Sequence, residues 1–357
     1  MQRRAGSLGL ILLSVSYPFQ RCARRLWCKL SAKDFLMTVS RILAALAFFL
    51  LGSAALAQPA YPAKPVRLIV AYSAGGSTDT LARVLAQKLT DIWGQQVLVE
   101  NRPGASTMIG ADALAKAAPD GYTIMVVSVD HVITPNLLPT PYDPIKDFAG
   151  AGGISSSGLV MVVNPSVPAN TLQELIAHAK SKPGALNYGS PASGGVQHLA
   201  GEMLSVLAGL KMQHIPYKGG GAVVTDLVGG QLQMYFTPPV TVVSHVKAGR
   251  LKALAISGDK RVEALPQVPT FAEAGLPAFN VTTWFGVAAP AATPPAIVAK
   301  VSADVAQVLR GAEIREKIAS LGMDPLIATP EQFSAFMRSE LTKYADIVKN
   351  SGVQLKQ

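Results

Sequence analysis

The amino-acid sequence predicts an α/β protein of two lobes, which two crossings of the chain connect around a ligand cleft. Apolar strand-like runs alternate with amphipathic helical patterns through residues 66–257, which is typical of α/β layers around a mostly parallel sheet. A glycine- and serine-rich loop leads into a helical pattern once in each half. The predicted crossings lie near 151–160 and 279–288, and the chain then returns to the first lobe. These limits give a leader at 1–57, a first lobe at 58–158 plus 282–357, and a second lobe at 159–281.

Residues 37–57 have the layout of a secretory signal peptide. Arg41 precedes a short apolar run, and small residues end the segment at Ala57, after which cleavage is predicted. The apolar run is too short to be a comfortable membrane span. Residues 1–36 are an unusually long preface, which favours Met37 as the true start, with an extended basic n-region as the alternative. The mature protein is therefore expected in the periplasm.

Much of the basic character of the chain comes from this leader. The 357-residue sequence has 32 basic and 22 acidic residues and a net charge of +10, but residues 1–57 hold eight of the basic residues and one acidic residue. Removing them leaves 24 basic and 21 acidic residues, a net charge of +3, so the case for a nucleic-acid partner largely disappears. Cys22 and Cys28 also leave, and a mature chain without cysteine has no disulfide, thiol nucleophile or thiolate metal site.

The first glycine-rich loop is a candidate anion site. A strand at Val66–Ala71 is followed by the loop 73–78 and by a helical pattern with Leu81, Leu85 and Leu89 on one face. Glycines let backbone N–H groups approach a ligand closely, and the start of a helix adds unpaired N–H groups and partial positive charge. The alternative is an ordinary strand-to-helix connection, which also favours glycine and a hydroxyl cap.

The rest of the first lobe follows as alternating elements. Its predicted elements are a strand at 96–100, a loop at 101–107, a helix at 109–117 and a strand at 122–127. The chain is then irregular and rich in proline from Ser128 to Pro144. The segment Gly150 to Gly158 is expected to be flexible and to form the first crossing.

The second lobe repeats the pattern, with a second glycine-rich loop at 189–195. Asn170 or Thr171, together with Glu174, gives a capping signal for its first helix. The predicted elements are, in order, strand 159–163, helix 171–181, a short strand ending at 187–188, helix 196–207, strand 213–216, helix 222–228, strand 232–236, helix 240–247 and strand 252–257.

After the segment 282–287, a proline-rich link leads to two predicted amphipathic helices. The second of them carries an apolar stripe of Phe333, Phe336, Met337, Leu341, Tyr344 and Val348.

No motif for catalysis, a cofactor or a metal accompanies these elements. The loop at 189–193 lacks the spacing of a nucleophile elbow, and the glycine runs form neither a dinucleotide fingerprint nor a P-loop. The five histidines are scattered and show no metal-ligand spacing. We therefore predict a protein that is not an enzyme, with no cofactor and no metal.

Several motifs resemble one known family, in order, through essentially the whole mature chain. They are VRLIVAYSAGGSTDTLAR, the NRPGAST segment with DGYT, LNYGSPASGGVQHLAGEML, HIPYKGGGAVVTDLVGGQLQMYF, GRLKALAISGDKR with VPTFAEAG, and WFGVAAP. They look like the signatures of the Bug-type periplasmic substrate-binding proteins of tripartite tricarboxylate transporters. The resemblance implies a type II periplasmic binding-protein fold, a monomer that closes on an organic carboxylate and delivers it to membrane permease subunits.

The resemblance also implies ligand contacts from the loops of both lobes. Carried over by matching motif, they are Ser73, Gly75, Gly76, Ser77, Asp79, Ser128 and His131 of the first lobe, and Ser190, Ala192, Ser193, Gly194 and His198 of the second. The family loop often has Pro-Gly-Ala-Gly-Gly where this chain has Ala105-Ser106-Thr107, so the shape of the pocket is expected to differ there.

Residue chemistry favours a different role for some of these positions. A carboxylate beside an anion site repels the ligand, so Asp79 is expected to accept N–H bonds and orient its loop. His131 and His198 could each donate to a ligand carboxylate or be satisfied structural histidines. Lys218 could place positive charge near the cleft or be an ordinary exposed lysine. Trp284 and Phe285 line the hinge or simply pack in the core, and core packing is favoured.

The sequence thus predicts a periplasmic receptor for a small carboxylate, with two alternatives. One is a periplasmic subunit that senses the anion for a signalling partner. The other is a periplasmic hydrolase, in which Ser190 would be required for turnover and not only for affinity.

Overall fold

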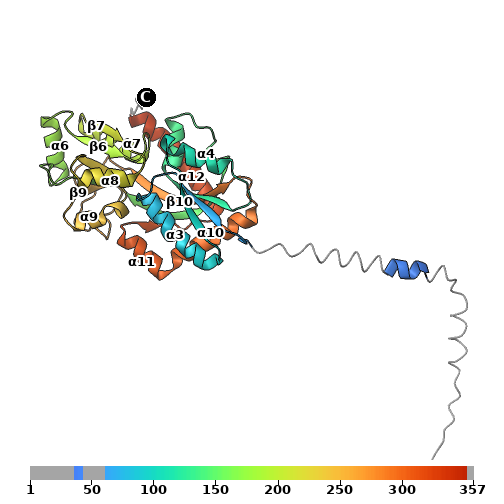
Figure 1. Cartoon of the computed structure of the whole chain (residues 1–357). Helices are drawn as coiled ribbons and strands as arrows, with labels where there is room; N and C mark the ends of the chain where they lie inside the picture. The colour runs from blue at the N-terminus through green and yellow to red at the C-terminus, as the bar shows by residue number, and fades with distance from the viewer. Residues whose placement is uncertain (1–35, 43–60, 352–357) are drawn as a thin grey trace, which may run out of the picture. The chain divides into compact units, whose positions relative to one another are not determined.

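The computed structural model describes residues 36–42 and 61–351, which fall in two units, 1–60 and 61–357 (Figure 1). In the first unit, residues 36–42 are helical. Most of the predicted signal peptide, including the cleavage site after Ala57, lies outside the described residues. The second unit contains two lobes, each built on its own β-sheet.

The first sheet has six strands in the order β11-β4-β10-β3-β1-β2. β1 is parallel to β2 and β3, whereas β10 is antiparallel to β3 and β4, and β11 is antiparallel to β4. Its strands are β1 (Val66–Val70), β2 (Val97–Asn101), β3 (Thr123–Ser128), β4 (Phe148–Gly158), β10 (Thr282–Pro290) and β11 (Asp324–Pro325).

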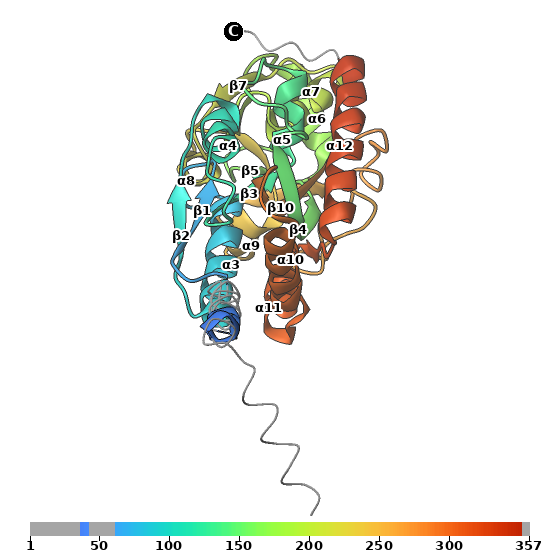
Figure 2. The ribbon, with the colours of Figure 1, turned by 90° about the vertical axis from the view of Figure 1, so that its right-hand side faces the viewer.

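The helices of this lobe cover both faces of the sheet, and α10 and α12 both pack on β4 (Figure 2). They are α3 (Ser77–Trp93), α4 (Met108–Ala115), α5 (Asp130–Ile133), α10 (Pro295–Arg310), α11 (Ala312–Ser320) and α12 (Pro330–Ser351), with short 3-10 turns η2 (Ala105–Thr107) and η3 (Thr134–Asn136). The prediction of two C-terminal helices is wrong, since a break at Gly311 separates α10 from α11. The stripe of α12 is confirmed at Phe333, Met337 and Tyr344, which are buried.

The second sheet has five strands in the order β7-β6-β8-β5-β9. The capping signal before α6 is confirmed, because Thr171 Oγ1 accepts from Glu174 N at 3.1 Å and Glu174 Oε2 accepts from Asn170 N at 2.7 Å. The elements are β5 (Val160–Val163), α6 (Leu172–Ser181), β6 (Asn187–Ser190), α7 (Val196–Ala208), β7 (Gln213–Pro216), α8 (Gly220–Val228), β8 (Met234–Thr237), η4 (Pro239–Thr241), α9 (Val243–Lys247) and β9 (Lys252–Ile256).

Both sheets are mixed, so the prediction of a mostly parallel sheet is wrong. β6 is parallel to β7 and β8, but β5 is antiparallel to β8 and β9. The antiparallel pairs arise where the chain changes lobes, because β4 runs on into β5 and β10 returns beside β4. The exact limits of the lobes stay a prediction.

The segment Gly150 to Gly158 is a strand paired with β10 and not the flexible segment expected from the sequence. It lies within β4, and its glycines make room for neighbours instead of loosening the chain. A Cβ on Gly153 would lie 2.3 Å from the carbonyl oxygen of Leu326, and a Cβ on Gly150 would lie 3.0 Å from Phe333. Close packing between a strand and a helix or loop therefore explains the glycines.

Trp284 and Phe285 are buried on β10. The ring of Trp284 packs edge-on against Phe333 and Phe336 of α12, and its Nε1 donates to Glu340 Oε2 at 3.0 Å. Core packing, the favoured expectation, is confirmed for Trp284. Phe285 also reaches the cavity between the lobes.

Candidate functional site

A small cavity lies between the two lobes. Its volume is ≈ 20 Å³, room for about one water molecule, so the lobes stand closed against each other. Its lining comes from both lobes and consists of Tyr72, Gly76, Ser77, Thr78, Ser128, Asp130, Pro191, Val196, Gln197, Gly220, Tyr235, Thr283 and Phe285.

Three helix N-termini converge on this cavity. α3 begins at Ser77 in the first lobe, and α7 and α8 begin at Val196 and Gly220 in the second. First-turn N–H groups have no acceptor within their own helix, and each helix start carries roughly half a positive elementary charge. No lysine, arginine or histidine is among the described residues that line the cavity. Helix ends and hydroxyl groups therefore supply its attraction for an anion.

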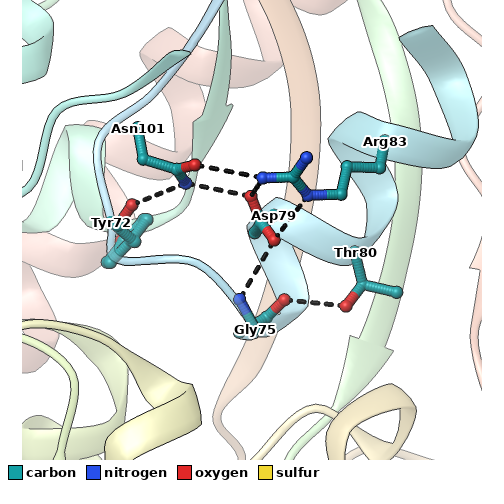
Figure 3. Close-up of polar contacts among 7 residues, drawn as sticks. Tyr72, Gly75, Asp79, Thr80, Arg83 and Asn101 are labelled. Atoms are coloured by element: carbon teal, nitrogen blue, oxygen red, sulfur yellow. Dashed lines mark hydrogen bonds and ion pairs between the residues drawn. The ribbon is translucent and has the colours of Figure 1, made fainter. Parts of the chain in front are cut away.

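The loop before α3 is held by a carboxylate of its own helix (Figure 3). Asp79 Oδ2 accepts from Gly75 N at 3.0 Å, and Arg83 forms two hydrogen bonds to the same carboxylate at 2.9 and 3.0 Å. Asn101 Nδ2 donates both to Asp79 Oδ1 and to the carbonyl oxygen of Tyr72, at 2.9 Å each. Asp79 does not line the cavity. Its predicted role as a support for the loop is confirmed by these contacts.

These contacts also keep Asp79 ionised. Burial alone raises the pKa of Asp79, but the hydrogen bonds from Arg83, Gly75 and Asn101 outweigh burial and hold the pKa below its ordinary value. The left-handed conformation of Gly75, with φ of +85°, turns its N–H toward the carboxylate. The glycine is needed here for backbone geometry.

The two lobes meet backbone to backbone through glycines. Ser73 N and Oγ both donate to the carbonyl oxygen of Lys218, at 3.2 and 3.0 Å. A Cβ on Gly76 would lie 3.4 Å from Gly220 N. Ser73 is therefore a contact between lobes, and the glycines 219–221 at the start of α8 form the second-lobe side of this contact, which was not predicted from the sequence. The run of three glycines before a helix was the signal that could have identified it.

The loop after β3 contributes a carboxylate that the sequence analysis also missed. Asp130 Oδ1 accepts from Val196 N at 2.8 Å, at the start of α7 in the opposite lobe. Asp130 Oδ2 accepts from the hydroxyl of Tyr72 at 2.6 Å, and that hydroxyl is 2.9 Å from Ser128 Oγ. Ser128, which was predicted, does line the cavity. Desolvation raises the pKa of Asp130, because it outweighs the hydrogen bonds from Tyr72 and Val196.

His131 points away from the cavity. Its Nε2 is 2.9 Å from the carbonyl oxygen of Pro144, and its ring stacks on Tyr142 and meets Phe148 edge-on. Burial lowers the pKa of His131 to about 4. Of the two roles considered for it, these contacts are those of a structural histidine.

The second-lobe loop is built on two stacked histidines. The rings of His198 and His214 lie 3.7 Å apart, and His198 Nδ1 accepts from Gly194 N at 3.0 Å. Ser190 Oγ donates to the carbonyl oxygen of Ala192 at 2.8 Å and lies 2.7 Å from His214 Nε2. These contacts shape the loop. The residues that make them do not line the cavity, but their neighbours Pro191 and Val196 do.

The Ser190–His214 pair has the separation of a nucleophile and base, but not their chemistry. Ser190 is fully buried, and its proton goes to a backbone carbonyl. Burial lowers the pKa of His214 to about 3, which makes it a poor base. Within residues 36–42 and 61–351, no group of three or more potential metal ligands is present.

Of the ligand contacts predicted from the sequence, the structure brings three together at the cavity: Gly76, Ser77 and Ser128. Ala192 and Ser193 line a neighbouring pocket with Lys218 and the loop 105–107. Ser73, Gly75, Asp79, Ser190, Gly194 and His198 hold the surrounding loops in place.

Comparison with known proteins agrees with this architecture. Residues 81–353 match the family described as the tripartite tricarboxylate transporter family receptor. BugT of Bordetella pertussis is 38% identical over 327 residues, covering 90% of this chain and 100% of BugT. The chain belongs to the tripartite tricarboxylate transporter receptor family. Members of this family are periplasmic binding proteins, and the fold is the two-lobed fold of that class.

Solved structures of the family have the same fold. The R. palustris protein Rpa4515 with adipate is 31% identical, with a TM-score of 0.80, covering 82% of this chain and 99% of that chain. MatC of Rhodopseudomonas palustris with bound malate is 30% identical, with a TM-score of 0.77, covering 81% of this chain and 100% of that chain. In the described part of this chain, no helix is both long and apolar enough to cross a bilayer.

Proposed function

We propose that this protein is an extracytoplasmic solute receptor that binds a small organic carboxylate between its lobes. In this proposal it is secreted through its signal peptide, works as a periplasmic monomer, and delivers the ligand to the membrane subunits of a tripartite tricarboxylate-type transporter. The observation that carries it is the convergence of three helix N-termini, from both lobes, on one cavity.

The helix ends also give a reason for closure on an anion. Closing brings the starts of α3 and α8 together, with Gly76 against Gly220, and both ends carry partial positive charge. Two like ends repel each other, and a carboxylate bound in the cleft that both ends line offsets that repulsion. An anion therefore stabilises the closed form more than the open form, which is the requirement for ligand-driven closure.

The ligand contacts in this proposal are the first-turn N–H groups and the hydroxyls of the cavity. Gly76, Ser77 and Ser128 serve on the first lobe, and the starts of α7 and α8 on the second. Micromolar binding needs about 8 kcal/mol, which several charge-assisted N–H and O–H hydrogen bonds can provide without a lysine or arginine. The carboxylates bound by the relatives Rpa4515 and MatC support this ligand class.

Titration of the purified protein tests the proposal. The panel contains mono-, di- and tricarboxylates, amino acids and aromatic acids, followed by calorimetry and by the melting temperature. At least one carboxylate is expected to bind with a stoichiometry of about one and to raise the melting temperature. A panel without any binding carboxylate contradicts the proposal, and turnover of a carboxylate ester would favour the hydrolase alternative.

A further inference from the structure

Asp130 is a buried carboxylate in the wall of the cavity that has no cationic partner. It is 2% exposed, and its hydrogen-bond donors are neutral, the hydroxyl of Tyr72 and the N–H of Val196. No lysine, arginine or histidine among the described residues lines the same cavity. A buried charge without a counter-charge is costly, so such a group in the wall of a cleft is a candidate for ligand binding.

The first lobe alone holds this carboxylate in position. Tyr72 and Ser128 form a hydrogen-bonded chain with Asp130, and all three belong to the first lobe: Tyr72 follows β1, Ser128 ends β3 and Asp130 begins α5. Of the hydrogen bonds to Asp130, only the one from Val196 N comes from the other lobe. Asp130 therefore remains on the wall of the open cleft, where an entering ligand meets it.

The second lobe is shaped to receive a carboxylate at this point. A Cβ on Gly195 would lie 2.6 Å from Asp130 Oδ2, so Gly195 leaves the space that the carboxylate occupies. The backbone of Gly195 has φ of −80°, which any residue can adopt. Contact with Asp130, and not backbone conformation, is thus the reason for glycine at this position.

The charge balance of the cavity limits the charge of its ligand. Three helix starts supply roughly +1.5 elementary charges, and Asp130 removes one. The remaining positive charge suits a zwitterion or a monoanion better than a dianion. A second carboxylate placed near Asp130 would be repelled, whereas an ammonium or hydroxyl group would be bound.

We infer that Asp130 determines the ligand specificity of the cleft, and that it selects a carboxylate bearing an ammonium or hydroxyl donor over the unsubstituted carboxylate of the same length. This inference rests on the proposed function, because it names the ligand class of the same cleft. One carboxylate of the ligand lies at the helix starts, and the donor pairs with Asp130. Desolvation raises the pKa of Asp130, and an ammonium group beside it would offset that effect.

Two series of ligands that differ by one group test the inference. Succinate, malate and aspartate share their carbon chain, as do propionate, lactate and alanine, and calorimetry on the purified protein gives a Kd for each. In the wild type, the members with a donor are expected to bind about 10- to 100-fold more tightly than the unsubstituted acid in at least one series, as for a hydrogen bond to a charged group. In Asp130→Asn, this ratio is expected to fall by about tenfold.

Asp304→Asn is the matched control. Asp304 is also a buried carboxylate of the first lobe, but it accepts from Trp93 Nε1 and Lys300 Nζ and does not line the cavity. The Asp304→Asn variant should leave unchanged the ratio of Kd values between the unsubstituted acid and the acid with a donor. If Asp130→Asn unfolds, Asp130→Ser provides the same test with a hydroxyl in place of the carboxylate.

The outcomes separate this inference from the proposed function. Equal or tighter binding of the unsubstituted acids by the wild type overturns the inference while the receptor proposal stands. A ratio that survives in Asp130→Asn overturns it as well. If no acid binds at all, the proposed function fails first, and the inference fails with it.

Discussion

Asp79 and Asp130 are both buried carboxylates that accept a backbone N–H next to the start of a helix, but their surroundings differ in charge and in origin. Asp79 lies in the first turn of α3 and accepts from Gly75 of its own loop, with the guanidinium of Arg83 beside it. Asp130 accepts from Val196 of the other lobe and has no cation beside it. The same contact therefore makes a rigid support in one place and an exchangeable contact in the other.

The difference shows why sequence position alone does not define a ligand site. A carboxylate whose partners are all local and include a cation is already satisfied, and it stabilises the loop. A carboxylate whose partner belongs to a moving lobe is satisfied only when that lobe closes. We expect mutations at the first to change stability and mutations at the second to change binding.

The largest effect is expected from Asp79→Ala. The change removes the acceptor for Gly75 N and Arg83, and leaves Asn101 Nδ2 with only its bond to the carbonyl oxygen of Tyr72. The free energy of unfolding should fall by about 3 kcal/mol in urea titration, the scale of losing hydrogen bonds to a buried charge. Arg83→Gln should cost less, because the side chain of Arg83 is 55% exposed. Equal costs for the two variants would contradict the view that the buried carboxylate is the centre of this support.

The next largest effect is expected at the glycines that cap α3 and α7. Gly195 and Gly76 have nearly the same extended conformation, with φ of −80° and −87°, so alanine is equally acceptable to both backbones. A Cβ at 195 would lie 2.6 Å from Asp130 Oδ2, whereas a Cβ at 76 would lie 3.4 Å from Gly220 N. Gly195→Ala should therefore weaken binding of the best ligand in the panel by about 10- to 100-fold, as for overpacking of about 1–3 kcal/mol, and Gly76→Ala should weaken it less.

The double variant Gly195→Ala with Asp130→Ala is the control for that comparison. Removing the carboxylate removes the clash, so at saturating ligand small-angle scattering should show that ligand-dependent closure returns, although the affinity lost with Asp130 does not. A Gly195→Ala variant that closes and binds like the wild type would show that Asp130 moves aside freely. The contact between Asp130 and Val196 would then not be needed for closure.

Local patterns explain what the sequence could predict. The strand before residue 71, the glycine-serine loop and the apolar face of α3 are all encoded within a few turns of chain, and so is the support role of Asp79, four residues from Gly75. The capping box at Thr171 was found for the same reason. The two-lobed fold followed from the order of such elements and from the family motifs.

Long-range contacts explain what the sequence could not predict. The contact of Asp130 with Val196 joins residues 66 positions apart, and Asp130 stands in a proline-rich stretch without a periodic pattern. Ser73 meets Lys218 across 145 positions. The glycines of β4 suggest flexibility from sequence alone, because the neighbours that pack on them, such as Leu326, come from the end of the chain. In each case the deciding partner comes from another element or lobe.

Tyr72→Phe is expected to have a smaller effect than either glycine or Asp79 variant. It removes the hydroxyl that donates to Asp130 at 2.6 Å and lies 2.9 Å from Ser128, while the ring stays buried. The cost in unfolding free energy should be about 1.5 kcal/mol, the low end for a hydrogen bond to a charged group. Urea titration measures it, and Tyr122→Phe, whose hydroxyl accepts from the exposed N–H of Ala63, is the control with little expected cost. A Tyr72→Phe variant as stable as that control would mean that Asp130 does not depend on the first lobe for its position.

The smallest effect is a difference in the pH dependence of stability between Asp79→Asn and Asp130→Asn. The pKa of Asp79 is lowered in the folded state, so its stabilising contribution is present at neutral pH and is lost as the pH falls through that lowered pKa. The pKa of Asp130 is raised, so the folded state holds its proton more tightly than the unfolded chain does, and this contribution is lost as the pH rises through the raised pKa. Relative to wild type, Asp79→Asn should therefore be more damaging at pH 7 than in acid, and Asp130→Asn less damaging at pH 7 than in acid. Each difference amounts to about 1.4 kcal/mol for every unit by which the pKa is shifted, and urea titrations at several pH values measure it. If the unfolding free energy of both variants changed with pH in the same way, the two carboxylates would have similar environments. That result would contradict the distinction between Asp79, which is paired locally, and Asp130, which has no cationic partner.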